Sequence, residues 1–196
     1  MTTGYIIAIF AIVKTSTDMF EKETSIQAIL YVLERLGESL ADIHKICKIL
    51  YFADQKHLSQ YGRTITGDDY IKMPYGPVPS KIEDMFKALR GESFFSDCVE
   101  EVSKYFGLKN KYVLEAKQKC DTDYLSKTDM KCLDYAVDKC KDKSFNEITE
   151  MSHDFAWNNA ALGRRISEKD ILREVGDTEE YIEYATQKPT FSLAFA

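Results

Sequence analysis

The sequence lacks the short motifs that mark the common catalytic sites. Its 196 residues contain no glycine-rich phosphate-binding loop, no Gly-x-Ser-x-Gly elbow and no His-Glu-x-x-His helix. No cysteine stands beside an obvious base that would activate it as a nucleophile. The sequence therefore contains none of these catalytic motifs, and we expect a protein that is not an enzyme.

The cysteines are few and show no paired pattern. Five are present, at positions 47, 98, 120, 132 and 140, without a Cys-x-x-Cys pair. The odd number argues against a disulfide framework and fits a reducing cytoplasm. His44-x-x-Cys47 has the spacing of two metal ligands on a helix, but no second pair completes the four ligands of a structural zinc site. We expect no metal, no cofactor and a cytoplasmic location.

The sequence has no hydrophobic run long enough to span a membrane, although an apolar segment lies near its start. That segment, YIIAIFAIV from Tyr5 to Val13, is too short to span a bilayer. It also lacks the basic region and the small-residue cleavage site of a signal peptide. We expect residues 1–23 to form an apolar N-terminal extension, either a strand or a loosely attached segment, with Met19 as an alternative start.

Positive charge is in short supply. The chain has 26 Lys and Arg against 32 Asp and Glu, a formal net charge of −6. This balance favours neither nucleic acid nor an anionic membrane as a partner, and it favours a positively charged protein surface. The stretch from Ser167 onward is the most acidic, and it is either a solvated face or a docking surface for a basic partner.

Helix-capping signals and turn residues outline the fold. A Ser or Thr followed three residues later by Gln, Glu or Asp predicts six helices, with caps at Thr24, Ser39, Ser80, Ser126, Ser144 and Ser167. Two short hairpins are expected, one turning at 67–68 between 64–66 and 70–73, the other turning at 107–110 before the alternating run 112–116. The prediction is a mostly α-helical α+β fold with a small antiparallel sheet at one edge.

The central stretch, Ile43–Tyr61, is expected to be a long amphipathic helix. Its core-facing stripe is apolar except for Asp54 and His57, which lie three residues apart. A buried polar group without a partner costs about 1–3 kcal/mol, so each should bond the other or nearby backbone. We interpret them as a structural polar pair, with a catalytic or metal role as the alternative.

An aromatic ring interrupts the opposite face of this helix. Phe52 lies among Lys45, Lys48 and Lys56. Either a second layer of the protein covers this ring, or Phe52 and the neighbouring Tyr51 anchor a protein interface.

The corner that follows the helix is rich in proline. Three prolines between Pro74 and Pro79 fix the backbone. The segment Tyr75-Gly76-Pro77 is therefore pre-organised, which suits either packing against a helix or the presentation of a rigid recognition surface.

Two blocks of sequence resemble the Panacea domain of SocA-type antitoxins and phage-associated proteins. The first block joins Leu50-Tyr51-Phe52-Ala53, His57-Leu58 and Tyr61-Gly62-Arg63 to the run 75–80, Tyr-Gly-Pro-Val-Pro-Ser. The second is Met151 to Trp157, a helix ending in a Ser-His pair that leads to a tryptophan. Family members often have Gly-Pro before that tryptophan, whereas this chain has Phe155-Ala156. We expect the domain to cover residues 24–187, with a C-terminal tail at 188–196.

The resemblance implies an antitoxin of a type II-like toxin–antitoxin system that neutralises a cognate protein toxin by direct binding. The expected centre of the binding surface is aromatic: Tyr51, Phe52, Tyr75 and Trp157, with Gly76 and Pro77 at the corner. The alternatives are a proteolytic adaptor that delivers a toxin to a bacterial protease or unfoldase, and a phage- or prophage-associated regulatory protein. The tail ends in Leu-Ala-Phe-Ala, which is similar to degradation signals that such proteases read.

Overall fold

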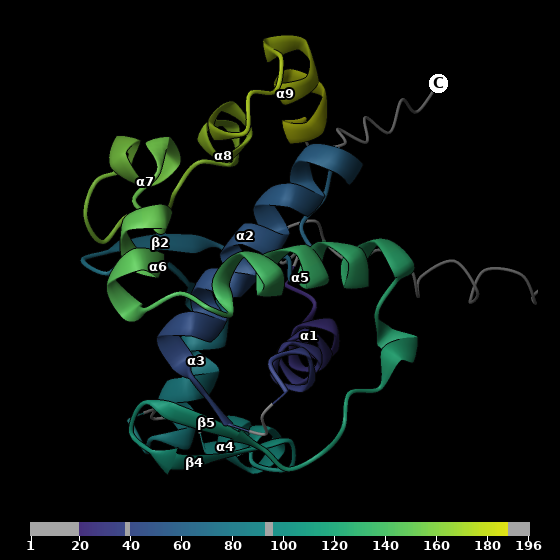
Figure 1. The fold of residues 1–196 in the computed structure, drawn as a ribbon, viewed down its shortest axis with the longest axis vertical. Coiled ribbons are helices and arrows are strands. Elements are labelled where there is room, and N and C mark those ends of the chain that lie inside the picture. Colours follow the sequence, from purple (N-terminus) through teal and green to yellow (C-terminus); the bar gives the residue numbers. More distant parts are fainter. Residues whose placement is uncertain (1–19, 38–39, 93–95, 188–196) are drawn as a thin grey trace, which may run out of the picture.

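The computed structural model describes residues 20–37, 40–92 and 96–187. The described residues form nine α-helices, one short 3₁₀ helix and five strands (Figure 1): α1 Lys22–Arg35, β1 Leu40–Asp42, α2 Ile43–Tyr61, β2 Tyr70–Met73, β3 Gly76–Pro79, α3 Ser80–Leu89, α4 Ser96–Val102, β4 Phe106–Asn110, β5 Val113–Ala116, η1 Thr122–Tyr124, α5 Lys127–Cys140, α6 Phe145–Ser152, α7 Phe155–Asn159, α8 Glu168–Glu174 and α9 Glu179–Thr186. The α+β class with mostly helical content is thus confirmed. The predictions for the N-terminal extension, the Ser39 cap and the C-terminal tail fall outside the described residues.

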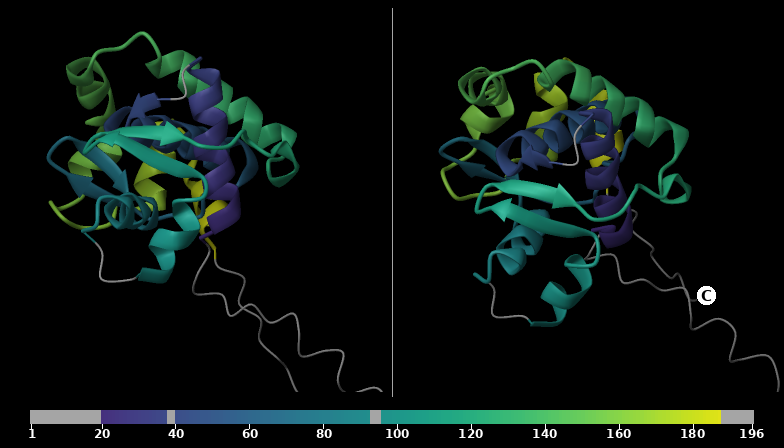
Figure 2. Two further views of the ribbon diagram at one scale, coloured as in Figure 1. Left: turned by 90° about the horizontal axis from the view of Figure 1, so that it is seen from below. Right: turned by 60° about the horizontal axis from the view of Figure 1, so that its bottom comes forward.

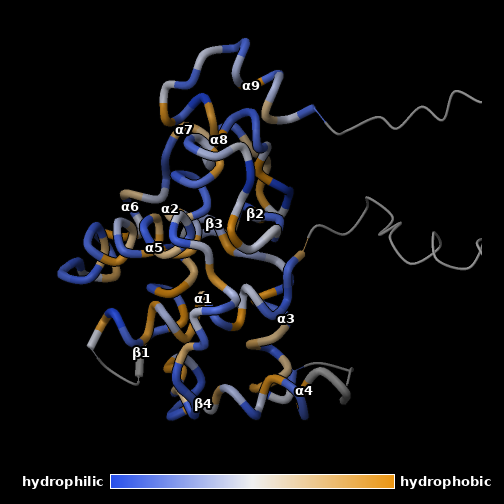
Figure 3. Tube along the Cα trace, turned by 90° about the vertical axis from the view of Figure 1, so that its right-hand side faces the viewer, coloured by the Kyte–Doolittle hydropathy of each residue, from blue (hydrophilic) through white to orange (hydrophobic). Residues whose placement is uncertain are grey.

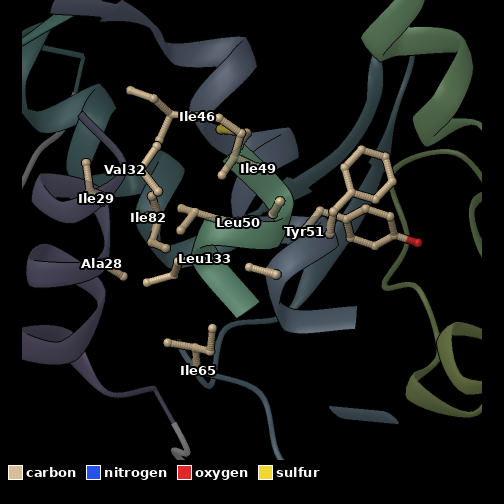
Figure 4. Close-up of a cluster of buried hydrophobic side chains, with 14 of the residues drawn as sticks. Ala28, Ile29, Val32, Ile46, Ile49, Leu50, Tyr51, Ile65, Ile82 and Leu133 are labelled. Atoms are coloured by element: carbon tan, nitrogen blue, oxygen red, sulfur yellow. The ribbon is translucent and has the colours of Figure 1, made fainter. Parts of the chain in front are cut away.

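The long helix α2 runs through the middle of the molecule (Figure 1). It packs against α1, α5, α6, α8 and β3, so helices and strand cover it on several sides. Figure 4 shows the result, a core in which side chains of α2 meet those of α1, α3 and α5: Ala28, Ile29, Val32, Ile46, Ile49, Leu50, Tyr51, Ile82 and Leu133. Figure 3 shows the hydrophobic positions recurring between hydrophilic ones along α1, α2 and α5, which is the pattern of helices with one buried face.

The helix caps are partly those predicted. Ser126 and Ser144 each form a complete capping box, at the starts of α5 and α6. In contrast, α1 begins at Lys22, ahead of Thr24, and α2 begins after Asp42, whose side chain accepts from the His44 amide. Three further helices, α4, α7 and α9, were not predicted.

The third helix is capped from a distance. The Asp68 carboxylate in the preceding loop accepts hydrogen bonds from the Lys81 and Ile82 amides at 2.9–3.0 Å. The N-cap position of α3 is Pro79 and not the predicted Ser80, and the Asp68 carboxylate takes the place of a local capping side chain. A negative group at the start of a helix also interacts favourably with the helix dipole.

The strands form two separate antiparallel sheets instead of the single one predicted. In the first hairpin, β2 pairs with β3 around a turn at Pro74-Tyr75, so the prediction of a turn at Gly67-Asp68 was wrong. The Thr66 amide and hydroxyl donate to the Asp54 carboxylate, so Thr66 does not pair with a neighbouring strand. The second sheet has the order β1-β5-β4 (Figure 2). The second hairpin is formed by β4 and β5, and β4 occupies residues 107–110, which were predicted to be the turn of that hairpin.

Among the described residues, none of the helices has the length and apolar character needed to cross a membrane. In the same part of the chain, no group of His, Cys, Asp and Glu side chains is arranged to hold a metal ion. Four cysteines, at positions 47, 120, 132 and 140, are free thiols.

Candidate functional site

A surface groove lies where four elements of the fold meet. Its lining comes from the first turns of α2, from the β2–β3 hairpin, from α3 and from the β4–β5 turn, with the first residue of α6 closing one end. We call it the aromatic groove; its volume is about 910 Å³. Its buried lining residues come from α2: the apolar Ile43 and Cys47, and Lys48.

Large apolar side chains stand exposed around the aromatic groove. Tyr75 and Tyr112 are each 63% exposed, Phe145 is 47% exposed and Met73 is 43% exposed. Tyr75 and Tyr112 occupy the two hairpin turns, and Phe145 is the first residue of α6. Clustered exposed apolar groups of this kind mark interaction sites more often than scattered ones do.

One histidine ties three of these elements together. The His44 Nε2 lies 3.2 Å from the Tyr75 carbonyl oxygen and 3.1 Å from the Thr149 hydroxyl, and its ring stacks on Phe145 at 4.0 Å. Phe145 in turn packs edge-on against Tyr75, with ring centroids 5.6 Å apart. Burial, with the charge of Lys48, lowers the pKa of His44 to about 4, so the ring is neutral near pH 7. The aromatic wall of the groove is therefore held in a fixed arrangement.

The hairpin turn is locked from below by a buried lysine. Lys48 is 1% exposed, and its Nζ donates to the Pro77 carbonyl oxygen at 2.9 Å. Burial lowers the pKa of this ammonium group to about 8. Gly76 has φ +99°, and a Cβ there would lie 2.2 Å from the Ser152 Oγ and 2.7 Å from the Lys48 Cε. Only glycine fits between these side chains.

Basic side chains supply the wall on the side of α3 and the β4–β5 turn. Lys87 pairs with Asp84 at 2.9 Å, and Lys111 pairs with Glu92 at 3.2 Å; both lysine side chains are about half exposed. Arg90 is more buried and bonds two carboxylates, those of Glu83 and Glu92.

Two of the predicted interface residues belong to the core instead. Tyr51 is fully buried and Phe52 is 2% exposed, so neither can serve as an accessible anchor. The Tyr51 hydroxyl donates to Asp154 at 2.8 Å, and the Lys139 ammonium covers the Phe52 ring at 3.8 Å from its centroid. Of the two alternatives for Phe52, the structure shows the covered one: α5, α6 and β3 cover the face of α2 that looked solvated, and they also bury Lys48.

Asp54 and His57 are both buried and hydrogen-bonded, and of the two expected arrangements they show the one in which each bonds nearby backbone and other side chains. Asp54 accepts hydrogen bonds from the Ile65 amide at 2.6 Å, from the Thr66 amide and hydroxyl, and from the Tyr70 hydroxyl at 2.8 Å. Burial raises the pKa of the Asp54 carboxyl, while these four donors oppose the rise. Asp54 therefore fixes the loop that follows α2.

His57 fastens a different part of the fold. Its Nδ1 lies 2.8 Å from the Arg63 carbonyl oxygen, and its Nε2 lies 3.0 Å from Asp129 of α5. Burial alone would raise the pKa of Asp129, but hydrogen bonds from His57 and Ser126 and the charge of Arg63 hold it well below the ordinary value. Every polar atom of the His57 ring is thus engaged in structural contacts.

Trp157 supports the hairpin from behind. It is partly buried, its Nε1 donates to the Met73 carbonyl oxygen at 3.1 Å, and its ring stacks on His153 with centroids 3.7 Å apart. The Lys72 ammonium lies 4.1 Å from the centroid of the Trp157 ring. Trp157 lies in the short helix α7, which begins at Phe155 after the Asp154 cap. Of the residues predicted for the interface, Tyr75 alone is an exposed side chain of the groove, with Gly76, Pro77 and Trp157 holding its turn.

The sequence interpretation missed His44, Tyr112 and Phe145 as residues of one site. The sequence interpretation placed the hairpin turns at 67–68 and 107–110, so it gave no signal that Tyr75 and Tyr112 occupy two-residue turns. Phe145 stands directly after the Ser144 cap, the first position of a helix. Nothing in the sequence spacing brings these three elements together.

Comparison with known proteins gives one match. A family model described as antitoxin SocA-like, Panacea domain, matches residues 46–158. No match to the chain was found among curated proteins or among solved structures. The matched stretch covers more than half of the 196 residues, and it includes Tyr75, Tyr112 and Phe145 of the aromatic groove. The chain therefore belongs to the family of SocA-like antitoxins that carry the Panacea domain.

Proposed function

We propose that the chain neutralises a cognate protein toxin by stoichiometric binding, and that the aromatic groove is the contact surface. The observation that carries this proposal is the set of exposed aromatic side chains that line the groove: Tyr75, Tyr112 and Phe145. Protein interfaces concentrate their binding energy in a few aromatic anchors of this kind, ringed by polar residues. The His44 contacts hold Tyr75 and Phe145 in place before binding, so little conformational entropy is lost on association.

We further propose that the chain performs no chemistry of its own. Asp54 and His57, the pair in α2 for which the sequence left a catalytic role open, are buried, and their polar atoms are engaged in structural hydrogen bonds. A general base must reach the proton that it removes. Neither group is positioned to do so, which supports action by occlusion of another macromolecule.

Co-expression with the product of the adjacent reading frame tests the antitoxin role. The neighbour alone should arrest growth, and the present chain should relieve the arrest. A Tyr75→Ala/Phe145→Ala variant should fail to relieve it, whereas Tyr184→Ala, a matched change at an exposed tyrosine of α9, should relieve it fully. Repeating the assay in strains without each cytoplasmic unfoldase-protease separates direct neutralisation, which survives, from adaptor activity, which is lost.

A further inference from the structure

We infer that the aromatic groove receives an amphipathic α-helix of the partner, with an apolar face for the aromatic wall and acidic side chains along its edge. The inference rests on the proposed function only for naming the partner as a toxin. The shape and chemistry of the occupant follow from three properties of the groove itself: its strand edges, its aromatic anchors and its charges.

The strands that line the groove leave no edge for an extended peptide. On β2, the Lys72 amide donates to the Arg164 carbonyl and the Gly163 amide donates to the Lys72 carbonyl, so the segment 163–166 already occupies that edge. On β3, Pro77 and Pro79 have no N–H to offer, and Lys48 takes the Pro77 carbonyl. An extended segment would leave its own backbone groups unpaired here, whereas a helix pairs them internally.

The lining matches the apolar face of a helix. Met73, Tyr75, Tyr112 and Phe145 stand at separate points around buried apolar residues such as Ile43. Helical ligands bind grooves through side chains at positions i, i+3 or i+4 and i+7, which project from one face. A volume of about 910 Å³ admits two or three such side chains together with part of the helix.

The charges of the groove differ in sign from those of the chain as a whole. Four basic side chains (Lys48, Lys87, Arg90, Lys111) and three acidic ones (Asp42, Glu83, Glu92) line it, a surplus of one positive charge on a chain of net charge −6.

The contacts of these charged side chains leave two of the lysines, Lys87 and Lys111, available to a partner. Glu83 and Glu92 bond Arg90, and Asp42 accepts from the His44 amide. Lys87 and Lys111 are held only in exposed ion pairs, which contribute little and exchange readily. Acidic side chains along the edge of a bound helix are therefore the complement that these two lysines select.

The test uses the full-length protein and a phage-displayed library of helix-forming peptides of about 18 residues, with an apolar face and randomised edges. Selection on the wild-type protein should enrich peptides with Asp or Glu at the edges. The variant Lys87→Glu/Lys111→Glu should bind an enriched peptide at least about tenfold more weakly at low salt and should itself select basic edges. The control Lys127→Glu/Lys131→Glu makes the same charge change at exposed sites on α5 and should alter binding less than about twofold.

Three results would overturn the inference: no enrichment, enrichment of proline-containing or basic-edged peptides, or binding that Tyr75→Ala leaves unchanged. All the changed side chains are solvent-exposed, so circular dichroism of each variant should match the wild type. Relief, by this chain, of the growth arrest that the neighbouring reading frame causes is measured separately. Growth rescue without peptide enrichment would refute binding of a helix in the groove and leave the antitoxin role standing. Peptide enrichment without growth rescue would support binding of a helix and refute the antitoxin role towards this neighbour.

Discussion

Replacement of Gly76 by alanine should strongly destabilise the protein and distort the aromatic groove. A non-glycine residue at φ +99° costs about 1–3 kcal/mol. The new Cβ would also meet the Ser152 Oγ and the Lys48 Cε at 2.2 and 2.7 Å, so Lys48 must move and lose its bond to the Pro77 carbonyl. Leaving that buried group unsatisfied costs about 1–3 kcal/mol more. The two costs together are roughly 2–6 kcal/mol, or a fall in Tm of about 4–24 °C for a chain of this size.

The assay is urea unfolding followed by circular dichroism, with Gly163→Ala as the matched control. Gly163 also has positive φ, +72°, but a Cβ there meets nothing within 4 Å, so the control bears only the backbone cost of about 1–2 kcal/mol. The Ser152→Ala change in the Gly76→Ala background should recover part of the loss, because it removes the closest clash. Equal destabilisation by the two alanines would refute the packing argument.

Three further predictions follow from the burial of α2 and the exposure of the groove. Phe52→Ala should reduce the free energy of unfolding by about 3–5 kcal/mol in a urea titration, because the ring is in the core; a neutral effect would contradict its placement. Tyr75→Ala and Phe145→Ala should each change stability by less than about 1 kcal/mol and weaken toxin binding, measured by calorimetry, about 30-fold or more. For Lys48, a folded pKa of about 8 against an ordinary 10.5 means that the unfolded chain binds this proton more tightly, so stability rises with pH across that window. Lys48→Met should abolish about 3 kcal/mol of this rise, measured as the difference between variant and wild type at both ends of the window.

Local patterns in the sequence predicted much of the helical framework. The apolar stripe of α2 was recognised from its spacing, and the capping boxes at Ser126 and Ser144 formed because they need only residues three positions apart. Where a residue distant in the sequence forms a competing hydrogen bond, the local pattern predicted the wrong structure. Asp54 accepts a hydrogen bond from Thr66, and the hairpin predicted at this position does not form. Asp68 accepts from the Lys81 amide and takes the place of a local cap of α3.

The site was less accessible to sequence reasoning. Lys48 and Phe52 occupy the face of α2 that its residue types mark as solvated, and the packing of α5, α6 and the β2–β3 hairpin buries them. Tyr75 was identified from its rigid turn, but its neighbours Tyr112 and Phe145 come from elements 37 and 70 positions later in the chain. Periodicity reports which face of an element is buried, and it does not report which exposed faces converge.

The central claim, that the aromatic groove is the surface that contacts the toxin, is tested most directly by hydrogen–deuterium exchange of the free protein and of its complex with the product of the adjacent reading frame. Slowed exchange should map to the β2–β3 turn, the β4–β5 turn and the first turn of α6. Slowed exchange confined to the acidic helices α8 and α9, with no change at Tyr75, Tyr112 and Phe145, would contradict it.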